Sequence, residues 1–484
     1  MNMKTESIWQ IVDTRECPPV KNDFSTDVLI IGGGITGFSA LYHLANSNLK
    51  VTLVERNICG EGITSKSTAK ITYLQDNTIL NISNFTTEQI AKKYIESQVY
   101  ATDLLSKIVE REHIDCDLTT CDSYLFSNTT KGVKKLREIF ELLKSIGIPL
   151  ENSQKVPFSE PFIHAIKAKD TYVFHPVKYI NALKEKFSSH IYEHSKVDKI
   201  DKVEDYYICQ INGHKIKASR VVLATHYPHF LLPFLFPLKS HVEVSYLGAK
   251  KTEHLQNYSA INIDKPTLSM RFHTDGKDSY IIYLLNSYAT NAVKSIPAAF
   301  DELASRENFE YLWSNNDIIT PDFMPYIGNL NKDDPTFLIA TGYNTWGMTN
   351  GTLAGRIIAD LIENKQNDYA SLFDPHRHLN LGRIINFPLD ISRSAISYLK
   401  STKKNTNNAS VVYTKKDGYD VAIYEDKDGV KHTVLNRCPH MKCGLVLNET
   451  EKTWDCLCHG SRFDLDGHCI EGPSNRDIVF PPKE

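Results

Sequence analysis

Two groups of residues in this sequence have the types and spacing to do chemistry. Near the C-terminus, Cys438-Pro-His440 and Cys456-Leu-Cys458-His459 bring thiols and imidazoles together. Such a dense set of cysteines and histidines indicates a metal site, and two of each could hold zinc tetrahedrally. Near the N-terminus, Gly32-Gly-Gly34-Ile-Thr-Gly37 fits the pattern GxGxxG. Its glycines would let the backbone approach a pyrophosphate at a helix N-terminus.

The glycine pattern lies where a dinucleotide site requires it, between a strand and a helix. The apolar run Asp27–Gly32 precedes it, and Phe38, Leu41 and Leu44 follow at helical spacing. A second apolar run, Val51–Glu55, completes a βαβ unit over residues 27–55. Glu55 ends that run about 20 residues after the glycines, where an acid accepts hydrogen bonds from a ribose. The context predicts a dinucleotide-binding domain.

The rest of the chain supplies further elements and a tether. Thr86-Thr-Glu-Gln89 is typical of a capping box that opens a long helix, and Gly147 is placed to end a second helix over residues 133–143. Aromatic and β-branched residues alternate from about 240 to 290, which favours an antiparallel sheet. Residues 400–408 are polar and positively charged, which is typical of a linker.

Composition excludes several classes of protein. With 484 residues, the chain is long enough for roughly three domains, since about 150 residues make one. A content of 41% hydrophobic and 23% charged residues excludes a largely disordered chain. A net charge of −3 gives no basic excess for nucleic acid, and no apolar stretch reaches the length of a membrane span. The first ten residues lack a signal-peptide pattern, so we expect a cytoplasmic protein whose scattered cysteines are buried thiols.

Residues 24–370 resemble the D-amino-acid oxidase/glycine oxidase family of FAD-dependent oxidoreductases. The resemblance is carried by the GxGxxG unit with Glu55-Arg56, by Gly62–Lys70, and by Asp322-Phe-Met-Pro325-Tyr-Ile-Gly328. It implies non-covalent FAD, with residues 64–70 along the pyrophosphate and flavin, Val197 at the adenine, and residues 345–350 beside the flavin pyrimidine ring. The implied FAD contacts are Gly32, Gly34, Ile35, Thr36, Gly37, Glu55, Arg56, Thr64, Ser65, Thr68, Ala69, Lys70, Val197, Thr225, Gly342, Gly347, Met348 and Thr349.

Two basic residues in this region have open roles. Arg271 lies in the expected substrate sheet and could clamp a substrate carboxylate as a catalytic-site residue, or be a surface arginine on an alternating strand. Lys70 could contact the flavin or be a solvated side chain.

Residues 409–484 resemble Rieske [2Fe–2S] domains. The resemblance is carried by Cys438-Pro-His-Met-Lys-Cys443, by Cys456-Leu-Cys-His-Gly-Ser461, and by Gly472-Pro473. It implies that Cys438 and Cys456 hold one iron and His440 and His459 the other, and that Ser461 hydrogen-bonds a cluster sulfur. It also implies a disulfide between Cys443 and Cys458, with a reduced pair as the alternative. Zinc remains the alternative metal.

These resemblances give a fold and a division into domains. We expect an α/β FAD-binding doubly wound fold with an α+β substrate domain built on an antiparallel sheet, followed by a small all-β Rieske domain. The FAD-binding domain takes residues 24–80, 165–230 and 311–375, the substrate domain 81–164 and 231–310, the linker 376–408, and the Rieske domain 409–484.

The combination predicts an oxidoreductase that joins two-electron and one-electron chemistry. We expect a dehydrogenase of a small organic substrate, such as an amine or amino acid, that passes electrons through the Rieske cluster to an external acceptor. Two alternatives are a reductase with the opposite electron direction and a non-catalytic redox sensor or electron-transfer protein.

Overall fold

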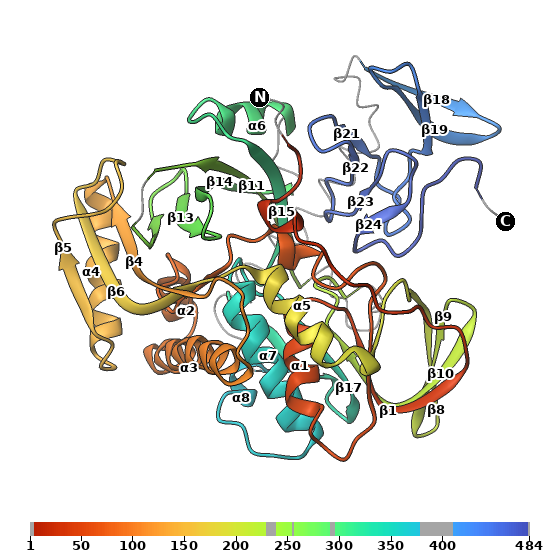
Figure 1. Ribbon diagram of the computed structural model, residues 1–484, viewed down its shortest axis with the longest axis horizontal. Helices are drawn as coiled ribbons and strands as arrows, with labels where there is room; N and C mark the ends of the chain where they lie inside the picture. The colour runs from red at the N-terminus through yellow and green to blue at the C-terminus, as the bar shows by residue number, and fades with distance from the viewer. Residues whose placement is uncertain (1–3, 229–238, 254–255, 291–295, 378–409, 483–484) are drawn as a thin grey trace.

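The computed structural model describes residues 4–228, 239–253, 256–290, 296–377 and 410–482. These residues form two sheet-based domains and a smaller C-terminal domain, drawn in blue, that lies beside them (Figure 1). Most of the predicted linker, from residue 378 onward, lies outside the described residues. Its first two residues belong to the body of the protein, because the Arg377 side chain is only 8% exposed and donates to Asp322 Oδ1 at 2.7 Å.

The first domain is built on a doubly wound sheet. The strand order is β16-β17-β10-β1-β2-β7. All of these strands are parallel except β16. Outside this order, β9 pairs with β10, and β8 pairs with β9. Residues 28–31 form a fully apolar buried run, as expected for a parallel strand covered on both faces. The strands are β1 (Phe24–Ile31), β2 (Val51–Val54), β7 (Ile191–Tyr192), β8 (Val197–Val203), β9 (Tyr206–Ile211), β10 (His214–Leu223), β16 (Tyr326–Asn331) and β17 (Asp334–Thr341).

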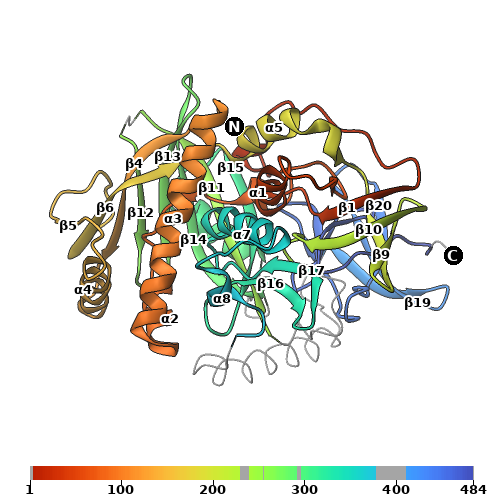
Figure 2. The same cartoon turned by 90° about the horizontal axis from the view of Figure 1, so that it is seen from below.

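Helices α1 (Ile35–Leu44), α5 (Pro176–Lys186) and α7 (Gly347–Ile362) pack together beside this sheet (Figure 2). The short helix α8 (Ala370–Phe373) and the 3-10 turns η1 (Ile8–Gln10), η2 (Ile63–Lys66) and η3 (Ser188–His190) complete the domain. Helices α1 and α7 approach closely at Gly355, where an added Cβ would lie 2.4 Å from the backbone nitrogen of Ala40. Gly37 brings α1 equally close to the glycine loop, because its Cβ would lie 1.9 Å from the carbonyl oxygen of Gly32.

The second domain is a nine-stranded sheet in the order β15-β11-β14-β13-β12-β4-β6-β3, with β5 on β6. It is antiparallel as expected, apart from the parallel pair β12 and β4. Its strands are β3 (Lys70–Ile71), β4 (Thr119–Ser127), β5 (Leu150–Ser153), β6 (His164–Val173), β11 (His241–Lys251), β12 (Tyr258–Asn262), β13 (Leu268–Thr274), β14 (Ser279–Ala289) and β15 (Tyr311–Ile319).

The domain boundaries expected from the sequence are wrong at three strands. β3, β6 and β15 pair into the nine-stranded sheet, although the sequence analysis placed them in the FAD-binding domain. The reason is that a buried strand has the same apolar pattern in either sheet, and its partner is set by the chain's path.

Four helices accompany this sheet, namely α2 (Thr78–Phe85), α3 (Glu88–Glu112), α4 (Thr130–Lys144) and α6 (Ile296–Ala304). The long helix α3 is confirmed, but its cap lies one residue later than expected. Thr87 accepts a hydrogen bond from the Ile90 nitrogen at 3.3 Å, so the capping box from Thr86 to Gln89 is wrong.

The C-terminal domain is all-β and small, as expected. One sheet contains β18 (Val411–Lys416), β19 (Tyr419–Glu425) and β20 (Lys431–Leu435), and the other contains β21 (Val446–Asn448), β22 (Thr453–Asp455), β23 (Arg462–Phe463) and β24 (Cys469–Glu471). Its core gathers the cysteines around Trp454 and Phe463. In the described part of the chain, no helix has both the length and the apolar character needed to cross a membrane.

Candidate functional site

A single cavity brings together residues from all three domains. Its wall includes most of the predicted FAD contacts, which come from the glycine loop, the segment after β2, η2 and the start of α7. The predicted residues in this wall are Gly32, Gly34, Ile35, Thr36, Glu55, Arg56, Thr64, Thr68, Ala69, Lys70, Val197, Thr225, Gly347 and Met348. Segments that are distant in the sequence thus meet at one site.

The glycine loop has the geometry of a pyrophosphate cradle. Helix α1 begins after Gly34, which has no side chain to cap the helix, so the backbone of the loop can be approached closely by an anion. Glu55 Oε2 accepts from the Gly33 nitrogen at 2.8 Å, which fixes the acid beside the loop. Thr64 Oγ1 accepts from the Ile35 nitrogen at 3.1 Å and ties η2 to the helix. These residues fit FAD.

Four predicted FAD contacts lie outside the cavity wall. Gly37 packs against Gly32, and Ser65 donates to the carbonyl oxygen of Glu61 at 2.9 Å. Thr349 accepts from Gln75 Nε2 at 3.2 Å, and Gly342 has a φ of +75°, which favours glycine. These four residues shape the elements that carry the wall.

Arg271 is buried and binds backbone carbonyls, which indicates a structural role. Its side chain is fully buried, so the surface-arginine alternative is wrong. Its Nη1 donates to the carbonyl oxygens of Thr68, Ala69 and Phe174 at 3.1, 2.8 and 3.0 Å, and its guanidinium lies 4.9 Å from the Trp9 ring. Arg271 is not part of the cavity wall, and the contacts that it makes hold the predicted FAD segment in place.

Lys70 is buried and forms part of the cavity wall, so the solvated alternative is wrong for this residue. Its ammonium group donates to Ser269 Oγ on β13. Burial, followed by the charge of Arg271, lowers the pKa of Lys70 to about 7. The side chain therefore offers an exchangeable proton at neutral pH next to the predicted flavin segment.

Sequence reasoning missed the part of the wall that the large sheet supplies. Leu247, Leu284, Asn315 and Asp317 face the cavity from β11, β14 and β15. The available signal was a run of four polar residues, from Ser314 to Asp317, in a fully buried strand. That signal was lost because β15 was placed in the other domain.

The four predicted iron ligands meet in the C-terminal domain. Cys438, Cys456 and His459 are buried, and the rings of His440 and His459 lie 4.9 Å apart. Neither ring nitrogen of His459 has a hydrogen-bond partner among the described residues. Burial lowers the pKa of His440 to about 4 and that of His459 to about 3, which keeps both imidazoles in the neutral form that binds metal. This donor set fits a Rieske cluster.

The Cys438 thiol is hydrogen-bonded to Cys456 and to Ser461, and these bonds outweigh burial and lower its pKa. Ser461 is fully buried, and its Oγ also accepts from the Ser474 nitrogen at 2.9 Å. Its position agrees with the predicted hydrogen bond to the cluster.

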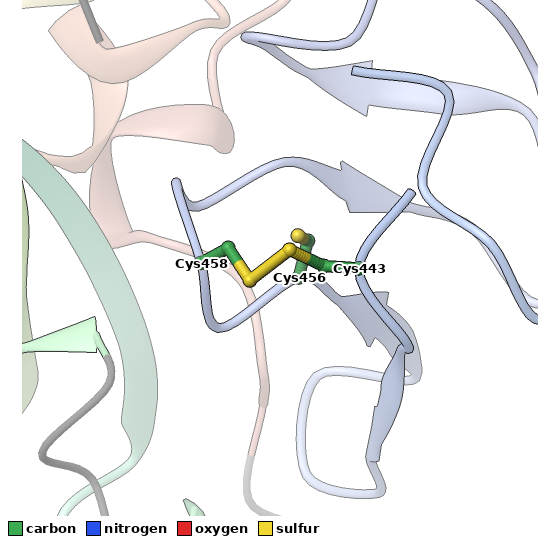
Figure 3. Close-up of side chains that lie close together, drawn as sticks. All are labelled: Cys443, Cys456 and Cys458. Atoms are coloured by element: carbon green, nitrogen blue, oxygen red, sulfur yellow. A yellow bond between two sulfur atoms is a disulfide. The ribbon is translucent and has the colours of Figure 1, made fainter. Parts of the chain in front are cut away.

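Cys443 and Cys458 form the predicted disulfide (Figure 3). The bond closes a sequence separation of 15 residues and joins the two ligand loops. The Cys456 sulfur lies within 4.8 Å of both disulfide sulfurs. Because two of these three sulfurs are bonded to each other, this trio is a ligand thiol beside a clamp and not a separate metal site. The reduced pair is therefore not what the structure contains. Apart from the two predicted iron ligands, the other cysteines are buried thiols, as expected.

The C-terminal domain completes the cavity wall. His459, Gly460 and residues 470–472 face the same space as the glycine loop. Glu471 pairs with Lys66 of η2, and its Oε2 accepts from Asn316 Nδ2 of β15 at 3.1 Å. Asn316 Nδ2 also donates to the Gly460 carbonyl oxygen at 3.1 Å. A predicted iron ligand therefore lies in the wall of the predicted flavin site.

Comparisons with known proteins agree with this geometry. The sequence model of the family described as "FAD dependent oxidoreductase" matches residues 27–361, and that of the "Rieske [2Fe-2S] domain" matches residues 397–482. YhfW of Bacillus subtilis (strain 168), which carries the name of a Rieske 2Fe-2S iron-sulfur protein, is 30% identical over 98% of this chain and 97% of its own. Gamma-glutamylputrescine oxidoreductase of Escherichia coli (strain K12) is 22% identical over 79% of this chain and 94% of its own.

Solved structures share the fold of the first two domains. Glycine oxidase from Geobacillus kaustophilus superposes with a TM-score of 0.60 at 18% identity, covering 73% of this chain and 99% of its own. L-proline dehydrogenase from P. horikoshii gives 0.59 at 17% identity, covering 74% and 98%. With an FAD-shaped cradle and a Rieske ligand set on one polypeptide, the chain belongs to the FAD dependent oxidoreductase family and carries a C-terminal Rieske [2Fe-2S] domain.

Proposed function

We propose that this protein is a dehydrogenase that oxidises a small amine or amino acid and passes the electrons through its Rieske domain to an external acceptor. When bound, FAD supplies two-electron oxidation and a Rieske cluster supplies one-electron transfer. The observation that carries the proposal is that His459, a predicted iron ligand, lies in the wall of the cavity formed by the predicted FAD segments. Two redox sites that share one wall favour transfer within the chain.

The substrate class is supported by the relatives and by the cavity. Gamma-glutamylputrescine oxidoreductase is similar over most of both chains, and its name describes chemistry on an amine derivative. The sheet face that lines the cavity joins the apolar Leu247 and Leu284 to the polar Asn315 and Asp317. Such a wall suits a small molecule with an apolar stem and a polar end.

The electron direction is supported by the ligand types. Two neutral imidazoles in place of two thiolates raise the potential of a cluster above that of all-cysteine clusters, which favours flow toward the cluster. Stopped-flow mixing of protein with either cofactor reduced first tests this direction. If a reduced cluster transfers electrons to the flavin faster than the reverse, the reductase alternative replaces the proposal.

A ligand substitution tests the relay. We expect Cys438→Ser to slow turnover with a one-electron acceptor at least about tenfold, because the two-thiolate iron loses a ligand, while substrate still bleaches the flavin anaerobically. Cys209→Ser, at a buried thiol of β9, is the matched control and should leave both rates unchanged. Equal turnover of Cys438→Ser and wild type would show that electrons do not leave through the cluster.

A further inference from the structure

A polar patch on the nine-stranded sheet reaches the cavity through two of its residues and is separate from the predicted FAD contacts. It consists of Glu243 and Ser245 on β11 and Asn315 and Asp317 on β15. In the antiparallel register, Glu243 lies directly opposite Asp317, and Ser245 lies opposite Asn315. Asn315 and Asp317 belong to the cavity wall beside Leu247 and Leu284. The Asp317 carboxylate and the Asn315 amide therefore line the cavity next to two leucines, and the Glu243 carboxylate lies opposite Asp317 on the neighbouring strand.

The hydrogen bonds of this patch leave acceptors unused. Asn315 Nδ2 donates to Asp317 Oδ2 at 3.3 Å, while Asn315 Oδ1 has no partner in the described part of the chain although the residue is only 6% exposed. Glu243 already accepts from Ser287 Oγ at 2.9 Å and pairs with His241 at 3.4 Å. A buried acceptor without a donor is costly, so the patch calls for a ligand that donates hydrogen bonds.

Cations that could serve a carboxylate are engaged elsewhere. Of the lysines and arginines in the described wall, Arg56 donates to the Ile470 carbonyl oxygen at 2.9 Å, Lys70 donates to Ser269, and Lys196 pairs with Asp198 at 3.7 Å. The wall also contains His226, but burial lowers its pKa to about 4, so its ring is neutral at pH 7 and supplies no cation. Arg271 lies outside the wall, where its Nη1 and Nε donate to backbone carbonyls and its Nη2 has no partner among the described residues. The patch itself contains acids and amide or hydroxyl groups, so it would repel a substrate carboxylate and attract an ammonium group.

We infer that Asp317, together with Asn315 and Glu243, binds the positively charged nitrogen of an amine substrate. An ammonium group has three donors, which the Asp317 carboxylate and the free Asn315 carbonyl oxygen would accept. Leu247 and Leu284 would contact its apolar stem. The inference rests on the proposed function and narrows its substrate class to amines held by their charge, and not to acids held by a carboxylate clamp.

The charge state of the patch gives the inference a pH dependence. Burial and the nearby Glu243 raise the pKa of Asp317 to about 7. His241 and Lys265 are the other charged or titratable groups that act on Glu243, and both favour its ionised form. An ionised Asp317 attracts a cation, so affinity for an ammonium group should increase as the pH rises through about 7.

Three isosteric probes test the patch without requiring turnover. The dissociation constants of n-butylamine, n-butanol and butyrate for the holoprotein are measured anaerobically by calorimetry at pH 6 and pH 8. We expect n-butylamine to bind at least about tenfold more tightly than the other two at pH 8, since hydrogen bonds to charged groups contribute about 1.5–3 kcal/mol. We also expect its advantage to shrink at pH 6. Equal or tighter binding of butyrate would overturn the inference.

Two variants locate the charge. Asp317→Asn should weaken n-butylamine binding about tenfold and remove its pH dependence, and Glu243→Gln should weaken it less. Glu253→Gln, at an exposed acid just beyond β11, is the matched control. Unchanged affinity in Asp317→Asn, or equal loss for n-butylamine and n-butanol, would contradict the inference. Binding is measured directly and does not depend on turnover. If the protein prefers n-butylamine but no amine bleaches the flavin, the result contradicts the proposed dehydrogenase activity and leaves the ammonium-binding patch intact.

Discussion

At the scale of single residues, Arg271 acts as an anchor for the segment that follows η2. Its guanidinium is buried and donates to three backbone carbonyls, so Arg271→Met removes a donor from each of them and leaves the Ala69 oxygen with only the Phe174 nitrogen at 3.4 Å. We expect this change to cost about 3 kcal/mol of stability and to release FAD more readily. Thermal unfolding followed by flavin fluorescence measures both effects. Arg220→Met, at a half-exposed arginine of β10, is the control, and equal losses in the two variants would contradict the anchoring role.

The sequence predicts a functional site well where the residues of that site lie close together in the chain. The ligand set of Cys438, His440, Cys456 and His459 converges as predicted, because each pair lies within one loop. The role of Arg271 was not readable, since its carbonyl partners are about 97 and 200 residues away in the chain. Asp317 was missed for the same reason, because its neighbour Glu243 lies on a strand 70 residues earlier.

At the scale of elements, the contact between α1 and α7 sets the position of the glycine loop. Gly355→Ala would place a Cβ 2.4 Å from the backbone nitrogen of Ala40, which cannot move without shifting α1. We expect a cost of about 1–3 kcal/mol and weaker FAD binding, measured by flavin titration of the apoprotein and by melting temperature. Gly351→Ala is the matched comparison and should be milder, because its Cβ meets the ends of the Ile35 and Thr36 side chains. The reverse order of severity would contradict this account.

Helices and strands with a clear apolar periodicity were predicted well, but the sheet to which some strands belong was not. The βαβ unit over residues 27–55, helix α3 and the buried strand ending at Leu223 follow from apolar spacing alone. The assignment of β3, β6 and β15 to the large sheet depends on pairing between distant segments. No local pattern encodes that choice, which explains why the boundaries of the first two domains were wrong.

At the scale of the whole molecule, Glu471 joins the C-terminal domain to the other two. Burial alone would raise its pKa, but Lys66 and Arg462 lower it to about 2. Its stabilising charge is therefore fully present above about pH 4.5 and is lost as the pH falls toward 2. We expect Glu471→Gln to weaken docking by about 1–3 kcal/mol, because the partly buried Lys66 loses its charged partner across the domain contact, while Arg462 keeps Glu451 and Asp455.

Small-angle scattering and stopped-flow spectroscopy check this prediction at neutral pH. The variant should have a larger radius of gyration and slower reduction of the cluster by the flavin, with unchanged bleaching of the flavin by substrate. Glu449→Gln changes an exposed acid of the same domain, which contacts Ser410, and serves as the control. A compact Glu471→Gln protein with wild-type transfer would show that this contact does not hold the domains together.

The shared wall of the cavity has a consequence for the history of the chain. His459, Gly460 and residues 470–472 line a space that residues of the first two domains also line. A Rieske module attached by a tether only could be gained or lost as an independent part. Here the contacts of Glu471 with Lys66 and Asn316 cross the seam, so a substitution on one side has to suit the residues on the other.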